Sequence, residues 1–138
     1  MIREEIDGII TWTVASGETL DVRAGERAQV HRGGMAWVRR GGYAVVNNSG
    51  RARIFDGAGA AVYAGGLVWI HEGGNAAVFR DGGAIVYAGG KVDVYHRGMA
   101  DVYEGGKAWV HPGGDAIAFT GAEAYASDGG KVWRYSGI

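Results

Sequence analysis

Gly-Gly-Met-Ala-Trp-Val-Arg-Arg at residues 33–40 and Gly-Gly-Leu-Val-Trp-Ile-His-Glu at residues 65–72 are two copies of one eight-residue unit. Divided into blocks of eight from residue 1, the 138-residue chain gives seventeen complete blocks with no insertion or deletion. The sixth position is Val or Ile in each of the first fourteen blocks, and the fourth position is Ala in eleven blocks. Self-similarity at a fixed period indicates a repeat architecture.

Within each block the apolar residues stand two positions apart, which is the alternation of a β-strand and not the spacing of a helix. Val, Ile, Trp, Tyr and Phe fill the strand positions, and such side chains pack well on a pleated surface. The Gly pair that opens many blocks supplies the positive φ angles of a tight corner. Each octad therefore predicts one short strand and a corner, with the even positions pointing inward.

These strands predict an all-β fold, a single-domain β-solenoid (β-helix) in which each coil stacks on the one before it. A flat meander of hairpins would leave its Ala and Val face uncovered. Two octads per coil, a sixteen-residue coil, would set a sixth-position Val against a second-position Gly and close-pack a thin core. Three octads per coil is the alternative, although Ala and Val would leave that wider prism partly hollow. Similar residues, such as His31, His71 and His111, also recur at a spacing of five octads, and this spacing fits neither coil size.

The ends of the repeat depart from the pattern, as the caps of an open stack would. The first blocks lack the Gly pair, and Glu4 and Trp12 stand where Ala is the rule. Near the other end, the sixth position changes to Ala and then to Arg134. We expect one domain over residues 1–138, with an N-terminal cap at 1–16, regular repeats at 17–128 and a C-terminal cap at 129–138.

Gly-rich strand–corner octads paired into sixteen-residue coils resemble the repeats of bacterial ice-nucleation proteins. The resemblance covers nearly the whole chain and concerns period and Gly placement. Those repeats carry a Thr-x-Thr ladder on a flat face, whereas only Thr11-Trp12-Thr13 has that pattern here, so the resemblance does not imply ice binding. The octad-repeating trimeric needle of contractile phage tails is similar as well, with different Val and Gly spacing.

The residues that carry most enzyme chemistry form no recognisable constellation. Cys is absent, and none of the four Ser residues lies in a nucleophile elbow. His31, His71 and His111 share the outward seventh position, but five octads separate each from the next, which argues against a metal site. Asp93 and Asp101 are expected to be solvated charges. We therefore predict that the protein is not an enzyme and has no cofactor and no metal.

The first residues include Glu4 and Glu5 where a secretory leader would be basic, and no apolar run approaches the roughly 18 residues of a membrane span. The sequence therefore predicts no leader and no membrane segment. By default we expect a cytoplasmic protein or a component of a virion or other assembly.

Arginine is concentrated in the first part of the chain and suggests a basic patch. Such patches bind phosphate backbones, yet the net charge of −1 and the absence of a recognition motif argue against nucleic acid. A solubilising role is the expectation. The residues of this predicted patch are Arg23, Arg27, Arg39, Arg40, Arg51 and Arg53.

Outward aromatic and apolar side chains are the strongest functional signal. In a sixteen-residue coil the odd octads share one sheet, and an exposed apolar strip usually marks an interface. The leading hypothesis is a non-catalytic scaffold that binds a second copy of itself or a partner protein; the alternative is a module that binds an extended polymer such as a polysaccharide. The predicted interface consists of Met35, Trp37, Leu67, Trp69, Ile85, Met99, Ile117 and Trp133.

Overall fold

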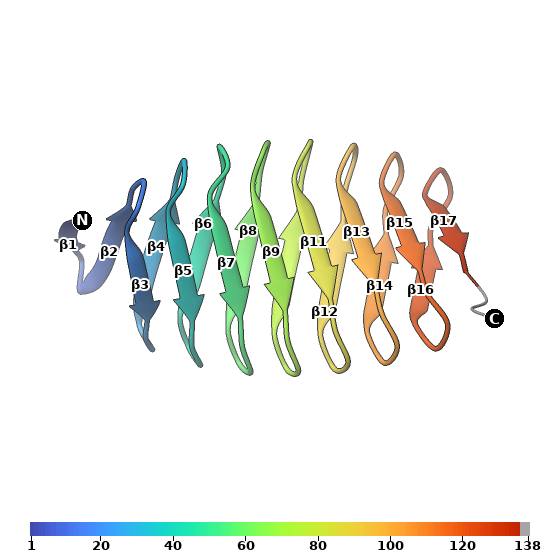
Figure 1. The fold of residues 1–138 in the computed structure, drawn as a ribbon, viewed down its shortest axis with the longest axis horizontal. Helices are drawn as coiled ribbons and strands as arrows, with labels where there is room; N and C mark the ends of the chain where they lie inside the picture. Colours follow the sequence, from blue (N-terminus) through green and yellow to red (C-terminus); the bar gives the residue numbers. More distant parts are fainter. Residues whose placement is uncertain (136–138) are drawn as a thin grey trace.

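The computed structural model describes residues 1–135, and every regular element in that range is a β-strand. Figure 1 shows the coils following one another in a row from the N-terminal to the C-terminal end. The strands are β1 (Ile2–Ile6), β2 (Ile9–Val14), β3 (Thr19–Val22), β4 (Glu26–Val30), β5 (Met35–Val38), β6 (Tyr43–Val46), β7 (Arg51–Ile54), β8 (Gly59–Val62), β9 (Leu67–Ile70), β10 (Asn75–Val78), β11 (Gly83–Val86), β12 (Lys91–Val94), β13 (Met99–Val102), β14 (Lys107–Val110), β15 (Asp115–Ala118), β16 (Glu123–Ala126) and β17 (Lys131–Arg134).

The strands form two sheets that lie back to back. Sheet A has nine strands in the order β1-β2-β4-β6-β8-β10-β12-β14-β16, and sheet B has eight in the order β17-β15-β13-β11-β9-β7-β5-β3. From β2 onward, neighbouring strands are parallel and sixteen positions apart in the chain, as in the pairing of Val78 with Val94. The predicted β-solenoid with two strands per coil is confirmed, and the alternative of three strands per coil is wrong.

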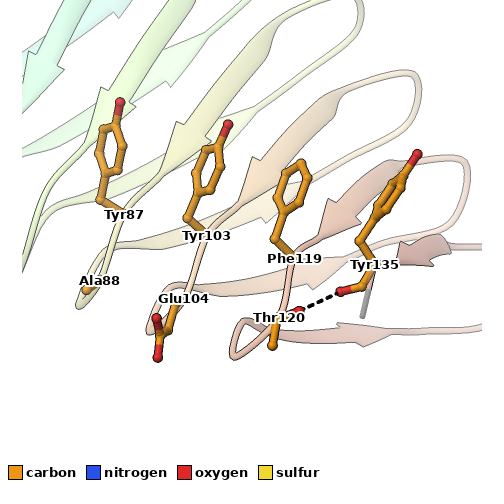
Figure 2. A pocket seen from close by; sticks show the side chains of 7 residues that line it. All are labelled: Tyr87, Ala88, Tyr103, Glu104, Phe119, Thr120 and Tyr135. Carbon is orange, nitrogen blue, oxygen red and sulfur yellow. Dashed lines mark hydrogen bonds between the residues drawn. The ribbon is translucent and has the colours of Figure 1, made fainter. Parts of the chain in front are cut away.

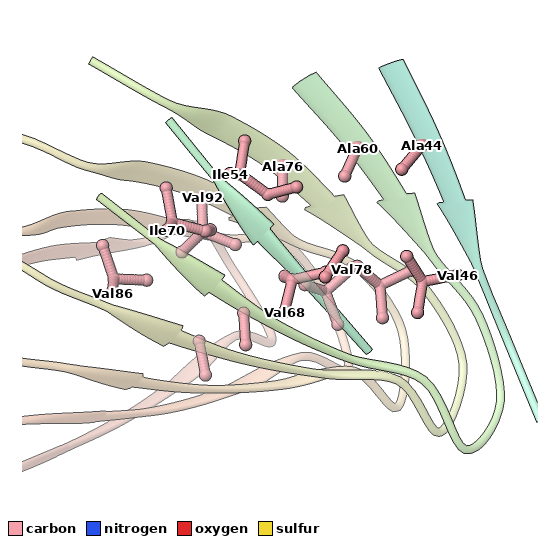
Figure 3. Packing of buried hydrophobic residues seen from close by; sticks show 14 of the residues in the cluster. Ala44, Val46, Ile54, Ala60, Val68, Ile70, Ala76, Val78, Val86 and Val92 are labelled. Atoms are coloured by element: carbon pink, nitrogen blue, oxygen red, sulfur yellow. The ribbon is translucent and has the colours of Figure 1, made fainter. Parts of the chain in front are cut away.

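The core is a thin layer of small side chains between the two sheets. Ala at the fourth position and Val or Ile at the sixth position are buried along the regular coils, as Ala44, Val46, Ile70 and Val78 illustrate (Figure 3). Among the described residues no polar or charged side chain is buried. The even positions thus point inward, as the sequence predicts for these coils.

Each corner is a tight turn closed by a backbone hydrogen bond. The N–H of Gly74 donates to the carbonyl of His71 at 2.9 Å, and Gly73 between them has a φ of +80°. The corners also stack, because the N–H of Gly73 donates to the carbonyl of Gly89 on the next coil at 2.9 Å. A left-handed residue at this position explains why Gly opens most octads.

The first octad does not join the solenoid as the other octads do. β1 pairs antiparallel with β2 in sheet A, through a two-residue turn in which Asp7 and Gly8 have φ angles of 52° and 77°. This reversal inverts the inward and outward alternation. Ile6, which shares the inward Val and Ile column in the sequence, therefore points outward and is 66% exposed.

At the other end, the inward column stops being buried. Ala126 and Arg134 are exposed, and Arg134 Nη2 donates a hydrogen bond to the carbonyl of Ala124 on β16 at 2.8 Å. The guanidinium thus satisfies a backbone acceptor on the last described strand of sheet A. The predicted C-terminal cap extends to residue 138, and residues 136–138 lie outside the described range. Within that range, no helix has the length and hydropathy to cross a membrane.

Candidate interaction surface

The outer surface of sheet B, called face B here, carries three columns of side chains from the third, fifth and seventh positions of the odd octads. The pairing register aligns each column along the solenoid, for example Trp69, Ile85 and Asp101 at the fifth position. All eight residues of the predicted interface lie in the third and fifth columns of this face: Met35, Trp37, Leu67, Trp69, Ile85, Met99, Ile117 and Trp133.

Charged residues divide this surface into segments, which the sequence-based prediction of one long strip did not include. Arg51 and Arg53 on β7 separate the pair on β5 from the pair on β9. Asp101 on β13 and Asp115 on β15 occupy the same columns farther along. The continuous apolar part is a central block on β9, β11 and β13. This central block consists of Leu67, Trp69, Ile85 and Met99.

Stacked rings line one edge of face B. The six rings stand at the seventh position of successive odd octads, with centroid separations between 4.8 and 5.9 Å and interplanar angles of 6–21°. Figure 2 shows four of them side by side and the hydrogen bond from Thr120 Oγ1 to the carbonyl of Tyr135. These rings line an open groove of about 590 Å³, and that hydrogen bond is 3.1 Å long. This edge ladder consists of Phe55, His71, Tyr87, Tyr103, Phe119 and Tyr135.

A second ladder lies at the opposite edge of the coil, where the strands of sheet A end. Tyr63, Phe79, Tyr95 and His111 stack with centroid separations of 5.0, 5.0 and 4.4 Å. In both ladders each interior ring has neighbours on both faces, so ring edges and hydroxyl groups are what the surface presents. The ladders therefore stabilise the stack of coils.

The three histidines that recur at a spacing of five octads are not brought together. His31 and His111 belong to even octads and His71 to an odd octad, so His71 lies at the other edge. His111 Nε2 lies 3.1 Å from Asp93 Oδ1, and His31 Nδ1 lies 2.7 Å from Asn47 Oδ1. No group of three or more His, Asp or Glu residues suited to a metal ion occurs among residues 1–135.

The predicted basic patch is spread over both sheets. Arg27 lies on sheet A with its guanidinium 5.9 Å from the Tyr43 ring centroid. Arg39 Nε lies 3.2 Å from Asp21 Oδ1, and Arg40 is paired with a carboxylate as well, that of Asp56. Arg23, Arg51 and Arg53 remain on the side of sheet B. Because carboxylates neutralise two of these arginines and Arg27 lies on the other sheet, the six residues do not form a single basic surface.

Two titratable groups on face B are shifted by their surroundings. Asp101 lies between Ile85 and Ile117 in the fifth column, and burial there raises the pKa of its carboxyl group. Burial lowers the pKa of His71, and the nearby Arg53 guanidinium lowers it further. Arg53 Nη1 lies 3.3 Å from His71 Nε2, which makes neutral imidazole the favoured acceptor for that N–H. Face B thus holds a neutral ring beside an arginine.

Sequence reasoning named the large side chains but missed what covers their ring faces. The guanidinium of Arg39 lies 5.5 Å from the Trp37 ring centroid, and that of Arg53 lies 5.1 Å from the Trp69 ring centroid. On sheet A, Trp109 stacks on Tyr125 at 6.2 Å. The contacts of Arg53 with Trp69 and of Trp109 with Tyr125 join neighbouring coils. The predicted sixteen-residue coil places each pair in one column, but the repeat does not specify that one side chain lies over the ring of the other.

No family model and no curated protein matches the chain. Among solved structures, it is similar to the crystal structure of the TibC-catalysed hyper-glycosylated TibA55-350 fragment, with 23% identity and a TM-score of 0.42. That similarity covers 91% of this chain and 71% of the other. The two threonines of the ice-nucleation-like motif, Thr11 and Thr13, pair with Arg27 and Gln29 on the next strand, so the motif does not continue as a ladder.

Proposed function

We propose that the protein is a non-catalytic scaffold that self-associates through face B. The observation that carries the proposal is the central block, where Leu67, Trp69, Ile85 and Met99 adjoin without an intervening charge. Met99 is 44% exposed, and the neighbouring edge ladder extends the apolar surface. Leu67, Trp69 and Ile85 are half-buried, so the central block is a partly exposed apolar patch, and contiguous apolar surface patches favour protein–protein contact.

The flat geometry of face B supports a scaffold over a catalyst. Enzyme sites need polar groups that converge in a concave pocket, whereas the grooves along this surface are open. The rigid spacing of the coils instead offers a regular, wide surface to a partner. Polar side chains that are spread over the faces of a solenoid do not converge on a substrate, so this arrangement suits assembly better than catalysis.

Self-association is tested by sedimentation equilibrium on the parent chain and on Trp69→Lys and Ile85→Lys variants. We expect the parent to dimerise and both variants to weaken the dimer, because a buried ammonium group would face apolar surface. Ala77→Lys and Gln29→Lys, on the outer surface of sheet A, are the matched controls and should dimerise like the parent. A parent that stays monomeric at high micromolar concentration contradicts the proposal.

Polysaccharide binding is the second candidate function, and the covered ring faces count against it. Sugars stack on aromatic faces, while the rings of both ladders have neighbouring rings on theirs. Trp133, which is 50% exposed, is the most exposed tryptophan on face B among the described residues. Affinity electrophoresis with soluble polysaccharides separates the two ideas: retardation that Trp133→Ala abolishes would favour the binding module.

A further inference from the structure

The charges on the inner strands of face B, from β5 to β15, are segregated along the solenoid axis. Arg39, Arg51 and Arg53 stand on one side of the central block, on or just after β5 and β7. Asp101 and Asp115 stand on the other side, on β13 and β15. Between them, β9 and β11 carry no acidic or basic side chain in the third and fifth columns. The face is therefore basic at β5 and β7 and acidic at β13 and β15, while the end strands carry the opposite charges, Asp21 on β3 beside Arg39 and Lys131 on β17.

Two of these opposite charges lack an ionic partner within the described part of the chain. Arg53 lies over Trp69 and beside His71, and forms no ion pair with a carboxylate. Asp101 forms none with a cation and lies between two isoleucines. Both belong to the fifth column, three coils apart, which is roughly 14 Å at the usual strand spacing. That separation is too great for them to pair within one chain.

We propose, building on the self-association proposed above, that two copies pack face B to face B in an antiparallel arrangement that pairs Arg53 of each copy with Asp101 of the other. The two-fold axis lies between the copies, parallel to the strands, and passes between β9 and β11. It sets β7 against β13 of the partner subunit, and β9 against β11. Because a two-fold interface is self-complementary, every such contact occurs twice.

The same register also matches the apolar residues by size. Leu67 meets Gly83 of the partner subunit, so that the large leucine side chain lies over a glycine, which has no side chain. Trp69 meets Ile85 of the partner subunit at the centre, and the aliphatic stem of Arg51 covers Met99 of the partner subunit. Desolvated charges at an interface need a partner, and this register supplies one for Arg53 and for Asp101.

Other two-fold arrangements leave Arg53 and Asp101 without an ionic partner. An axis along the solenoid would set β7 against β7 and β13 against β13, which brings arginines near arginines and carboxylates near carboxylates. An antiparallel axis through β11 would place Trp69 on Asp101 of the partner subunit, although it would pair Arg51 with Asp115. The face measures roughly 38 Å by 17 Å from strand spacing and rise, or about 650 Å² per copy. Two such faces exceed the roughly 1,000 Å² total expected of a specific interface.

Charge reversal tests the register. Arg53→Asp and Asp101→Arg each place like charges together twice per dimer, so each should weaken dimerisation by about tenfold or more in sedimentation equilibrium. The double variant Arg53→Asp/Asp101→Arg restores both contacts and should dimerise within about threefold of the parent, a difference well under 1.4 kcal/mol. An equimolar mixture of the two single variants should form heterodimers more strongly than either forms homodimers.

Three results would overturn this register. The first is a double variant or mixture that shows no recovery. The second is recovery by Arg51→Asp/Asp115→Arg in place of the Arg53 and Asp101 pair, which would move the axis to β11. The third is a monomeric parent, which rejects self-association as well. If Trp69→Lys weakens the parent dimer but charge reversal shows no recovery, self-association stands and only the register fails. Circular dichroism melts verify folding, and Arg53→Glu with Asp101→Lys provides a second pair of reversals.

Discussion

Gly90 lies in direct contact with Ile70 of the opposite sheet. A Cβ atom on Gly90 would stand 2.8 Å from the carbonyl oxygen of Ile70 and 2.9 Å from its Cγ2. A Cβ atom on Gly74 would likewise stand 2.7 Å from the carbonyl oxygen of Ile54 and 3.1 Å from its Cγ2. The second-position Gly and the sixth-position Val or Ile therefore share one volume at each end of the core, which leaves no room for a methyl group.

Gly74→Val and Gly90→Val should each destabilise the fold. The added atoms would overlap backbone that cannot move without breaking a turn, so we expect a cost of about 1–3 kcal/mol or more. Thermal and urea melts measure it. In dilute monomeric solution Gly83→Val is the control, because its Cβ points outward and would meet Leu67 Cδ1 at an ordinary 3.5 Å and two backbone oxygens at 4.0 Å. Equal stability of Gly90→Val and the parent would contradict close packing at this contact.

The coil length follows from the same relationship and could be predicted from sequence. A block of eight with Gly at the second, Ala at the fourth and Val at the sixth position balances its volume only against a reversed copy of itself, as Val46 and Gly66 illustrate. Two strands per coil therefore follow from side-chain volume. The positions of the corners could be predicted as well, because the Gly residues that open the octads allow the positive φ of a tight turn.

The N-terminal hairpin was missed although its signal is local. Asp7-Gly8 between Ile6 and Ile9 is the dipeptide that favours a two-residue turn with both φ angles positive. The eight-residue register dominated the interpretation and placed Ile6 in the inward column. The sixteen-residue coil places Arg53 and Trp69 in one column, but the approach of the guanidinium to the Trp69 ring and to His71 depends on side-chain rotamers that the repeat does not specify.

Arg97→Gly should stabilise the fold. Arg97 occupies the corner position that is usually Gly and has a φ of 63°, which costs a residue with a Cβ roughly 1–2 kcal/mol. Part of that gain is lost because Gly loosens the unfolded chain, so we expect a net gain of about 0.5–1 kcal/mol. Arg97→Ala keeps the strain and loses the 4.0 Å contact with Asp81, and should give no gain in the same urea melts.

Phe79→Ala should cost more stability than Tyr63→Ala. Phe79 stacks between Tyr63 and Tyr95 at 5.0 Å on each side, whereas Tyr63 stands at the end of that ladder and is 43% exposed. Each stacked pair contributes about 0.5–1.5 kcal/mol beyond buried area, so the interior variant loses two such contributions and the terminal variant one. Equal losses in urea melts would mean that the rings act separately and that the ladder adds nothing.

Asp101→Asn should change the stability of a single chain and the strength of the dimer in opposite directions. Burial raises the pKa of Asp101 above its ordinary 3.8, so the native state binds this proton more tightly than the unfolded state does. The resulting stability is fully present below pH 3.8 and is lost as the pH rises through the native pKa. In dilute monomeric solution, the melting temperature of Asp101→Asn should therefore match the parent near pH 3 and exceed it at pH 7.

At pH 7 the same variant should dimerise more weakly, because asparagine keeps the shape of the side chain and removes the charge that Arg53 of the partner subunit would meet. Asp93→Asn on sheet A is the matched control. The Asp93 carboxylate lies 3.1 Å from His111 Nε2, so its loss should give no gain in melting temperature and should leave dimerisation unchanged. If Asp101→Asn melted higher and also dimerised as strongly as the parent, the Asp101 carboxylate would have no part in assembly, and the antiparallel register would lose its ionic contact.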